Sequence, residues 1–298
     1  MNTDSNNTFR YDLSVPAPAK LNLFLHITGQ RDNGYHDLQT LFQFVELHDQ
    51  LYFRLTETPT IKVIALKDTS VPDYEIIAPE DNLIYKAAKA LENHNQTSQG
   101  IEIHYKKNIP SGAGLGGGSS DAATTLLALN QLWQCNLSIE KLCEIGLTLG
   151  ADVPVFVNGK SVFAEGVGEK FTPYDPATPW YIIIKPKAHI ATAEIFSHPD
   201  LTRNTPTLKI SAALEHGGHN DCENVVRKLY PEVDDAMNWL GQFSSSKLTG
   251  TGACVFAEFS SQQEAIQIAQ QYSDSTAIFV AKGLNDNPAH RVLQELDF

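Results

Sequence analysis

A glycine-rich run carries the strongest chemical signal in this 298-residue sequence: Pro110-Ser111-Gly112-Ala113-Gly114-Leu115-Gly116-Gly117-Gly118-Ser119-Ser120-Asp121-Ala122-Ala123. A backbone without side chains can approach a ligand closely and direct several N–H groups into one concavity. The run also precedes an apolar stretch typical of a helix. The unpaired N–H groups and the dipole at a helix N-terminus favour an anion, most often phosphate. We therefore predict that residues 110–120 hold the phosphates of a nucleotide.

The pattern around this run excludes two common phosphate-binding motifs. A P-loop requires a lysine after its last glycine, whereas Gly118 is followed by Ser119-Ser120. A dinucleotide fingerprint requires an acidic residue at the end of a second strand, and residues 132–137 contain none. A flexible linker is also disfavoured, because linkers are polar on both sides and this run lies between an apolar strand and an apolar helix.

A lysine and an aspartate elsewhere in the chain could supply reactive groups. Lys20 stands at the start of an alternating strand, where an ammonium could neutralise a phosphate or lower the pKa of a hydroxyl. Asp152 lies in the apolar stretch 149–156, where an unpaired carboxylate would be costly. It could orient or deprotonate an attacking hydroxyl, held by Lys20, or it could cap a short helix that begins at Val153-Pro154. The two interpretations of Asp152 remain open at this point, and Lys20 taken alone could be a solvated lysine.

Two turn motifs add candidate binding groups. Asn33-Gly34 is a strong turn signal, and Tyr35 and His36 after it offer an aromatic face and a two-sided hydrogen-bonding ring. A second glycine-rich turn lies within residues 248–256. Each could be an ordinary turn, but the second could also close over the phosphates of a substrate together with residues 110–120.

The composition limits the classes of partner. The formal net charge is −13, which argues against nonspecific binding to nucleic acid or to an anionic membrane. No apolar stretch reaches the length of a membrane span, and the first residues do not resemble a signal peptide. Four scattered cysteines without metal-ligand spacing predict reduced thiols in a cytoplasmic protein. The sequence specifies neither a metal ligand nor an oligomeric state.

The elements that must position these residues interleave as an α+β fold in two lobes. We expect a disordered lead-in over residues 1–14, and a strand over 20–27 in which Leu21, Leu23, Leu25 and Ile27 share one face. Asp81 is expected to cap the helix at 82–94. Further strands are expected at 51–55, 61–65, 101–106, 161–165, 180–185, 253–259 and 276–281. Helices are expected at 82–94, 119–133, 139–149, 192–197, 207–215, 221–229, 231–240 and 261–271.

The motifs together resemble those of the GHMP kinases, the superfamily that includes homoserine, mevalonate and galactose kinases. The resemblance covers the chain from Ala17 to Arg291, and the glycine run alone is similar to the superfamily's phosphate loop. The discriminating pieces narrow it to the kinases of non-mevalonate isoprenoid synthesis that act on a cytidine diphosphate derivative of methylerythritol. These pieces are Pro18-Ala19-Lys20-Leu21-Asn22, Asp32-Asn33-Gly34-Tyr35-His36, Leu149-Gly150-Ala151-Asp152-Val153-Pro154 and Leu248-Thr249-Gly250-Thr251-Gly252-Ala253.

The resemblance implies a fold, a reaction and a set of roles. It implies a ribosomal-protein-S5-like ATP-binding lobe over residues 1–166 and a ferredoxin-like lobe over 167–298 that completes the substrate site. The reaction would be ATP-dependent phosphorylation of the 2-hydroxyl of the methylerythritol unit, with Mg²⁺ carried largely by the nucleotide. Asp152 matches the catalytic aspartate and Lys20 its paired lysine. Substrate contacts are implied for Asn22, Tyr35, His36, Phe196, Gly250 and Thr251.

Two other functions compete with this one. A homoserine or mevalonate kinase would share the glycine loop but lacks the Asn-Gly-Tyr-His element beside the first strand. A nucleotide-binding protein without turnover could use the same fold. Such a protein should lack the acid–lysine pair, whereas Lys20 and Asp152 are both present.

Overall fold

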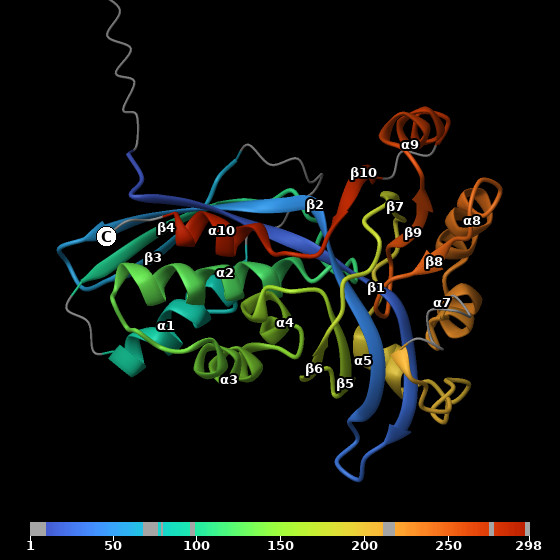
Figure 1. Cartoon of the computed structure of the whole chain (residues 1–298), viewed down its shortest axis with the longest axis horizontal. Coiled ribbons are helices and arrows are strands. Elements are labelled where there is room, and N and C mark those ends of the chain that lie inside the picture. The colour runs from blue at the N-terminus through green and yellow to red at the C-terminus, as the bar shows by residue number, and fades with distance from the viewer. Residues whose placement is uncertain are drawn as a thin grey trace, which may run out of the picture.

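The protein is described here from a computed structural model, which describes residues 10–67, 77–78, 80–95, 99–210, 218–273 and 277–295. Figure 1 shows two parts joined by a pair of long strands, with helices α1 to α4 against one part and α7 to α9 against the other. The strands are β1 (Leu13–Gln30), β2 (His36–Thr56), β3 (Ile61–Ala65), β4 (Gly100–Lys106), β5 (Val162–Gly166), β6 (Lys170–Pro173), β7 (Trp180–Lys185), β8 (Lys247–Leu248), β9 (Val255–Phe259) and β10 (Ala277–Leu284). The helices are α1 (Leu83–Asn95), α2 (Gly117–Leu132), α3 (Ile139–Leu149), α4 (Val153–Asn158), α5 (Thr192–Ser197), α7 (Glu223–Leu229), α8 (Pro231–Leu240), α9 (Gln262–Ala269) and α10 (Pro288–Gln294).

Strand β2 organises the sheet because it pairs with four other strands. It runs antiparallel to β1, β4, β5 and β10. The main path through the sheet is β3-β4-β2-β10-β7-β9-β8. The long β1–β2 pair therefore belongs to both parts of the molecule, and residues along it can face a site between them.

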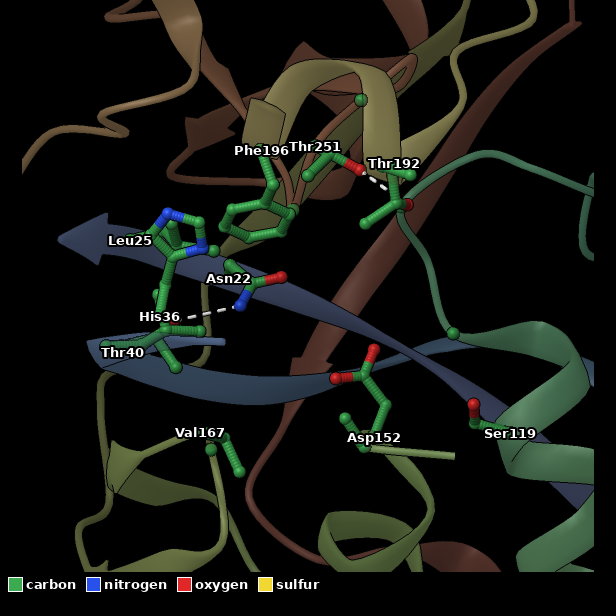
Figure 2. Close-up of a pocket in the computed structure, with 18 of the residues that line it drawn as sticks. Asn22, Leu25, His36, Thr40, Ser119, Asp152, Val167, Thr192, Phe196 and Thr251 are labelled. Carbon is green, nitrogen blue, oxygen red and sulfur yellow. Dashed lines mark hydrogen bonds between the residues drawn. The ribbon is translucent and has the colours of Figure 1, made fainter. Parts of the chain in front are cut away.

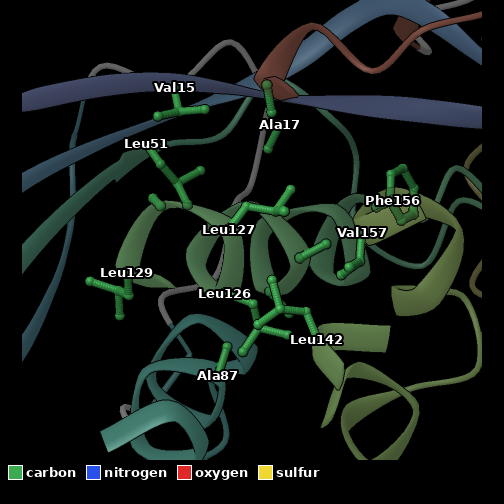
Figure 3. Close-up of a cluster of buried hydrophobic side chains, with 14 of the residues drawn as sticks. Val15, Ala17, Leu51, Ala87, Leu126, Leu127, Leu129, Leu142, Phe156 and Val157 are labelled. Carbon is green, nitrogen blue, oxygen red and sulfur yellow. The ribbon is translucent and has the colours of Figure 1, made fainter. Parts of the chain in front are cut away.

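Helix α2 forms the centre of the first core. Its apolar side chains point toward the sheet on one side and toward α1, α3 and α4 on the other, so the helix is buried nearly all round. Figure 3 shows this packing around Leu126, Leu127 and Leu129. The apolar composition of residues 122–129 thus fixes the position of the helix, and with it the loop that precedes the helix.

A second core lies under β7 and β9, and a third joins the two parts. The second contains apolar residues of α7, α8 and α9 packed on the sheet. The third contains Leu21 of β1, Leu115 of the glycine loop and Phe256 of β9, all fully buried. Because this third cluster contains residues of both parts, it holds the glycine loop rigidly between them.

Most expected elements are present, and several expectations are corrected. The helices at 192–197 and 231–240 and the strand at 180–185 have the expected bounds. Residues 1–9 of the expected lead-in lie outside the described residues. Leu13 and Ser14 belong to β1, so Lys20 lies inside a strand rather than at its start. The strand at 51–55 is the end of the 21-residue β2. The helix expected at 207–215 falls largely outside the described residues, and residues 207–209 are not helical.

Two local features explain further differences. A register shift between Asn22 and Leu25 interrupts the alternation in β1, so Leu25 lines the same cavity as Asn22 instead of facing away from it. The cap of α1 is Asn82 rather than Asp81, since the Oδ1 of Asn82 accepts the N–H of Ile84 at 2.9 Å. Ser138 caps α3, accepting the N–H of Lys141.

The division at residue 166/167 stays a prediction. The C-terminal helix α10 packs against β1 and α2, and β10 pairs with β2, so the end of the chain returns to the first part. Among the described residues, none of the helices is long and apolar enough to span a bilayer.

Candidate active site

A cavity of about 680 Å³ lies where the two parts meet. Figure 2 shows Asp152 and Ser119 toward one end, His36 and Phe196 toward the other, and Asn22 between them. Its lining comes from β1, β2, the glycine loop, the start of α4, helix α5 and the second glycine-rich turn. The predicted site residues among the lining are Lys20, Asn22, Tyr35, His36, Gly112, Gly114, Gly116, Ser119, Asp152, Phe196, Gly250 and Thr251.

Lys20 and Asp152 form an ion pair at the floor of this cavity. The Nζ of Lys20 lies 3.2 Å from the Oδ2 of Asp152. Lys20 is buried, and its ammonium also donates to the Oδ1 of Asn22 at 2.6 Å and to the carbonyl of Gly114 at 3.1 Å. Asp152 occupies the N-cap position of α4, but its side chain makes no capping hydrogen bond. The carboxylate therefore faces Lys20 and the cavity, which argues against a role as a helix cap.

Asn22 connects this ion pair to the surrounding strands. Its Nδ2 donates to the Oγ1 of Thr40 on β2 at 2.9 Å, and its backbone N–H donates to the Oγ1 of Thr249 at 3.0 Å. The Oδ1 is already used by Lys20. Asn22 thus holds the lysine in place, and its second Nδ2 hydrogen makes no hydrogen bond to a described residue. A substrate contact by Asn22 stays a prediction.

The glycine loop wraps closely over the lysine at the start of α2. Gly116 is the N-cap residue with φ 72°, and a Cβ there would lie 2.8 Å from the ring of Phe156 and 3.2 Å from the Cε of Lys20. Only glycine fits such a position without strain. Helix α2 begins at Gly117, two residues before the expected start, so the N–H groups of its first turn belong to Gly117, Gly118 and Ser119.

A second cavity, of about 390 Å³, shares the glycine loop as a wall. Gly112, Gly114, Gly116 and Ser119 line both cavities. A group bound at these shared residues would therefore lie between a ligand in the first cavity and a ligand in the second. The rest of the second lining includes Leu83, Tyr105, Lys107, Asp121 and the predicted residues Pro110, Ser111, Ala113, Gly117 and Gly118.

The second glycine-rich turn contacts the first loop directly. The N–H of Cys254 donates to the carbonyl of Ala113 at 3.1 Å, and a Cβ on Gly114 would lie 2.4 Å from the carbonyl oxygen of Thr249. Asn220 supports the turn by donating to the carbonyls of Leu248 and Gly250. The two glycine-rich segments thus lie against each other, and their closure over the phosphates of a substrate stays a prediction.

A buried charge cluster lies beneath the first loop. Lys107 donates to Asp49 and, at 2.7 Å, to the Oδ2 of Asp121, and all three side chains are nearly inaccessible. The Oδ1 of Asp49 also accepts the N–H groups of Asn108 and Ile109, which lead into the loop. Burial, together with the neighbouring Asp49, raises the pKa of Asp121 to about 8 against the attraction of Lys107.

The far end of the cavity is aromatic. The rings of His36 and Phe196 stack with centroids 5.0 Å apart, and Tyr35 is 63% exposed beside them. Arg203 donates from Nε to the Nε2 of His36 at 3.1 Å. Burial, and to a lesser degree the charge of Arg203, lowers the pKa of His36. This end can thus stack a flat ring and hydrogen-bond its edge.

Two predicted site residues line neither cavity. The side chains of Leu115 and Ser120 are fully buried. Leu115 packs in the third apolar cluster, and its carbonyl accepts the N–H of Lys20 at 3.0 Å. Sequence reasoning missed the supporting residues Thr40, Thr249, Asn220, Arg203, Lys107 and Asp49. Thr249 lay inside a quoted motif and could have been found; the others stand in no motif that marks them.

Family comparisons agree with the geometry. The family model described as GHMP kinases N terminal domain matches residues 82–160, and that described as GHMP kinases C terminal matches residues 200–277. The 4-diphosphocytidyl-2-C-methyl-D-erythritol kinase of Shewanella pealeana is 52% identical over 281 residues, which cover 94% of this chain and 97% of the relative. The chain belongs to this kinase family. The corresponding kinase of Aliivibrio fischeri strain MJ11 is 51% identical over 280 residues, 94% of this chain and 95% of the relative.

Solved structures confirm the expected fold. A crystal structure of 4-(cytidine 5'-diphospho)-2C-methyl-D-erythritol kinase aligns with a TM-score of 0.76 at 28% identity, covering 91% of this chain and 99% of the other. A mevalonate kinase aligns with a TM-score of 0.66 at 15% identity, covering 92% of this chain and 100% of the other, and shows the shared fold only. The chain is therefore an ATP-dependent kinase with the two-part α+β architecture of the GHMP kinases.

Within the residues that the structure describes, no group of three or more histidine, cysteine, aspartate or glutamate side chains could hold a metal ion. An Mg²⁺ ion that binds through nucleotide phosphates keeps several waters and needs few protein ligands.

Proposed function

We propose that this kinase transfers the terminal phosphoryl group of ATP to the 2-hydroxyl of 4-diphosphocytidyl-2-C-methyl-D-erythritol. The observation that carries the proposal is the position of the Lys20–Asp152 pair. It lies between a glycine loop suited to phosphates and an aromatic end suited to a pyrimidine. A substrate in which a diphosphate joins an alcohol to a cytidine would reach from the Lys20–Asp152 pair to the aromatic end within one cavity.

The nucleotide occupies the second cavity, with its phosphates on the shared loop. The N–H groups of Gly117, Gly118 and Ser119 supply donors at the helix N-terminus, where the dipole favours negative charge. The hydroxyl of Ser119, which lines both cavities, would hold a Mg²⁺–phosphate group. When bound, Mg²⁺ would offset charge on the phosphate oxygens.

The alcohol is activated from the opposite side of the loop. Asp152 accepts the proton of the 2-hydroxyl as the hydroxyl oxygen attacks the terminal phosphorus of ATP. The bond between that phosphorus and the ADP oxygen breaks at the same time. Lys20, held by Asn22 and Gly114, stabilises the charge that develops on the transferring group. A tertiary alcohol is a crowded nucleophile, so the orientation of its oxygen within the site contributes as much to the rate as the proton acceptor does.

The cytosine is recognised by His36, Tyr35 and Phe196. Phe196 and Tyr35 offer aromatic faces for stacking, and His36 offers a ring nitrogen to the edge of the base. Gly250 and Thr251 line the cavity between the base and the reactive end, beside the predicted path of the diphosphate. We also infer a cytoplasmic setting, because all four cysteines are unpaired thiols.

A coupled assay of ADP release tests the function. The purified protein is offered the cytidylyl substrate, mevalonate and homoserine separately, with ATP and Mg²⁺. We expect turnover of the cytidylyl substrate alone. Turnover of mevalonate or homoserine without the cytidylyl compound would reject the proposal, and ATP binding without turnover of any of the three would favour a non-catalytic protein.

A further inference from the structure

Arg203 donates hydrogen bonds to two of the base-recognising residues, His36 and Phe196. It lies in the irregular segment after α5 and is half-buried. Its Nε donates to the Nε2 of His36 at 3.1 Å. Its Nη2 donates to the carbonyls of Phe196 and His198 at 2.8 and 2.9 Å, and its Nη1 donates to the carbonyl of Leu201 at 3.1 Å. Four hydrogen bonds hold the guanidinium, and none of these acceptors is a carboxylate.

The contact with His36 fixes where the histidine carries its proton. A guanidinium has only donors and keeps its charge at any ordinary pH, so the Nε2 of His36 must be the acceptor. An accepting ring nitrogen carries no hydrogen, and the neutral ring then has its hydrogen on Nδ1. If both nitrogens of His36 were protonated, its Nε2–H would face the Nε–H of Arg203, and two donors would meet without an acceptor. Burial disfavours the charged ring further.

The fixed tautomer determines what the ring can offer to a base. No hydrogen bond from a described residue engages the Nδ1 of His36, so its N–H is available to a ligand in the cavity. Cytosine has two acceptors, N3 and O2, along its Watson–Crick edge, whereas uracil carries a hydrogen on N3. A single N–H donor can therefore bind cytosine at N3 but opposes uracil there. The other tautomer would present an acceptor at Nδ1 and remove this distinction.

The same guanidinium also places the stacking ring. Phe196 lies near the end of α5, and its carbonyl is one of the acceptors of Arg203. The Phe196 ring stacks on His36 with an interplanar angle of 24°. One planar, forked side chain thus connects the hydrogen-bonding group and the aromatic face, which a lysine with a single ammonium cannot reproduce.

We propose that Arg203 is a positioning residue for base recognition, which holds His36 as an Nδ1–H donor next to Phe196 and so makes the kinase prefer cytosine to uracil. The proposal rests on the function proposed above, since it concerns the base of the same substrate. It adds a residue that touches neither the reacting atoms nor, directly, the substrate.

Two measurements on Arg203→Ala and Arg203→Lys test this role. Nitrogen NMR of the His36 ring in the ligand-free protein should show the Nδ1–H form in the parent and a shift toward the Nε2–H form in both variants. Steady-state kinetics with the cytidylyl substrate and its uridylyl analogue should show the cytosine preference falling by about tenfold or more, mainly through KM for the cytidylyl compound. The KM for ATP should not change. The lysine variant keeps the positive charge and most of the volume, and it gives the answer if the alanine variant does not fold.

Arg227→Ala is the matched control. Arg227 bonds to Asp234, Glu223 and Asn238, and it lines neither cavity described above. Its loss should change neither the His36 tautomer nor the base preference. An unchanged tautomer and an unchanged preference in the Arg203 variants would overturn the proposal. If the parent enzyme does not phosphorylate the cytidylyl substrate, the proposed function fails, while the NMR result still decides whether Arg203 controls His36.

Discussion

The ammonium of Lys20 and the carboxylate of Asp152 lie 3.2 Å apart, although one belongs to strand β1 and the other opens helix α4. The pair is asymmetric: the side chain of Lys20 is 3% exposed, whereas that of Asp152 is 36% exposed. The lysine is thus fixed within the protein by Asn22 and Gly114, and the carboxylate is the member that a substrate hydroxyl can reach. This arrangement assigns proton acceptance to Asp152 and charge stabilisation to Lys20.

Asp152→Asn should abolish most turnover without unfolding the protein. Asparagine keeps the shape but is a far weaker proton acceptor, so kcat should fall by ~10²- to 10⁴-fold. Binding of both ligands should persist, because their other contacts remain. The melting temperature should change little, because Asp152 makes no capping hydrogen bond and an asparagine oxygen can still accept from Lys20, which Asn22 and Gly114 also hold. Stopped assays and calorimetric titration measure these quantities. Asp286→Asn, which removes an exposed partner of Lys160, is the control and should leave kcat unchanged. An undiminished kcat in Asp152→Asn would reduce Asp152 to a structural residue.

Gly116→Ala should damage the active site where Gly29→Ala does not. At Gly116 the backbone φ is 72°, and an added Cβ would press on Phe156 and Lys20. We expect at least a ~10-fold loss of kcat/KM, as for a small misplacement of a catalytic group. At Gly29, which lines neither cavity, an added Cβ meets only the Oδ2 of Asp37 at 3.9 Å, an ordinary contact. Equal activity of the two variants would contradict the close approach of the loop to Lys20.

Lys107→Met should strongly destabilise the fold. It leaves the carboxylates of Asp49 and Asp121 buried without their shared cation, and removing one partner of a buried ion pair costs about 3–5 kcal/mol. Lys141→Met removes only an exposed partner of Glu144 and should cost less than about 0.5 kcal/mol. Denaturant titration gives the two free energies of unfolding. A similar small cost for both variants would show that the buried cluster contributes nothing specific.

Asp121→Asn should change how stability depends on pH. The pKa of Asp121 is raised from 3.8 to about 8 in the folded protein, so the native state binds more protons than the unfolded state between these values. The free energy of unfolding contributed by this group is therefore complete below about pH 4 and is lost as the pH rises toward about 8. Relative to the parent, Asp121→Asn should become more stable across that interval, by about 1 kcal/mol or more. Urea titrations at several pH values test this, and parallel stability curves would refute it.

His36→Ala should weaken recognition of the cytidylyl substrate alone. It removes the ring that stacks on Phe196 and the hydrogen bond offered to the base, so KM for that substrate should rise by about tenfold or more. The affinity for ATP should stay the same, because His36 lines the first cavity and not the second. A loss confined to ATP binding would mean that the two cavities have been assigned the wrong way round.

The local patterns predicted the fold well where a single element decides its own structure. Helices α5 and α8 and strand β7 have the expected bounds. Pro231 at the start of α8 and the apolar run of β7 are local signals, and neither helix has a side-chain cap. The alternation in β1 failed beyond Asn22, since the register shift depends on pairing with β2. The start of α2 at Gly117 was also missed, because glycine is a poor helix former and only the packing around it stabilises a helix there.

The sequence by itself determined the kinds of groups available: a glycine loop for phosphates, a lysine, an aspartate, and a tyrosine–histidine pair. Only the tertiary structure decided how they act together. The third apolar cluster joins β1, the loop and β9, and this places Lys20 against Asp152 and Gly114 against Thr249. Arg203 likewise donates to His36 from a segment 167 residues further along the chain. Such contacts arise from packing between distant segments, and local sequence patterns do not indicate which distant residues the core brings together.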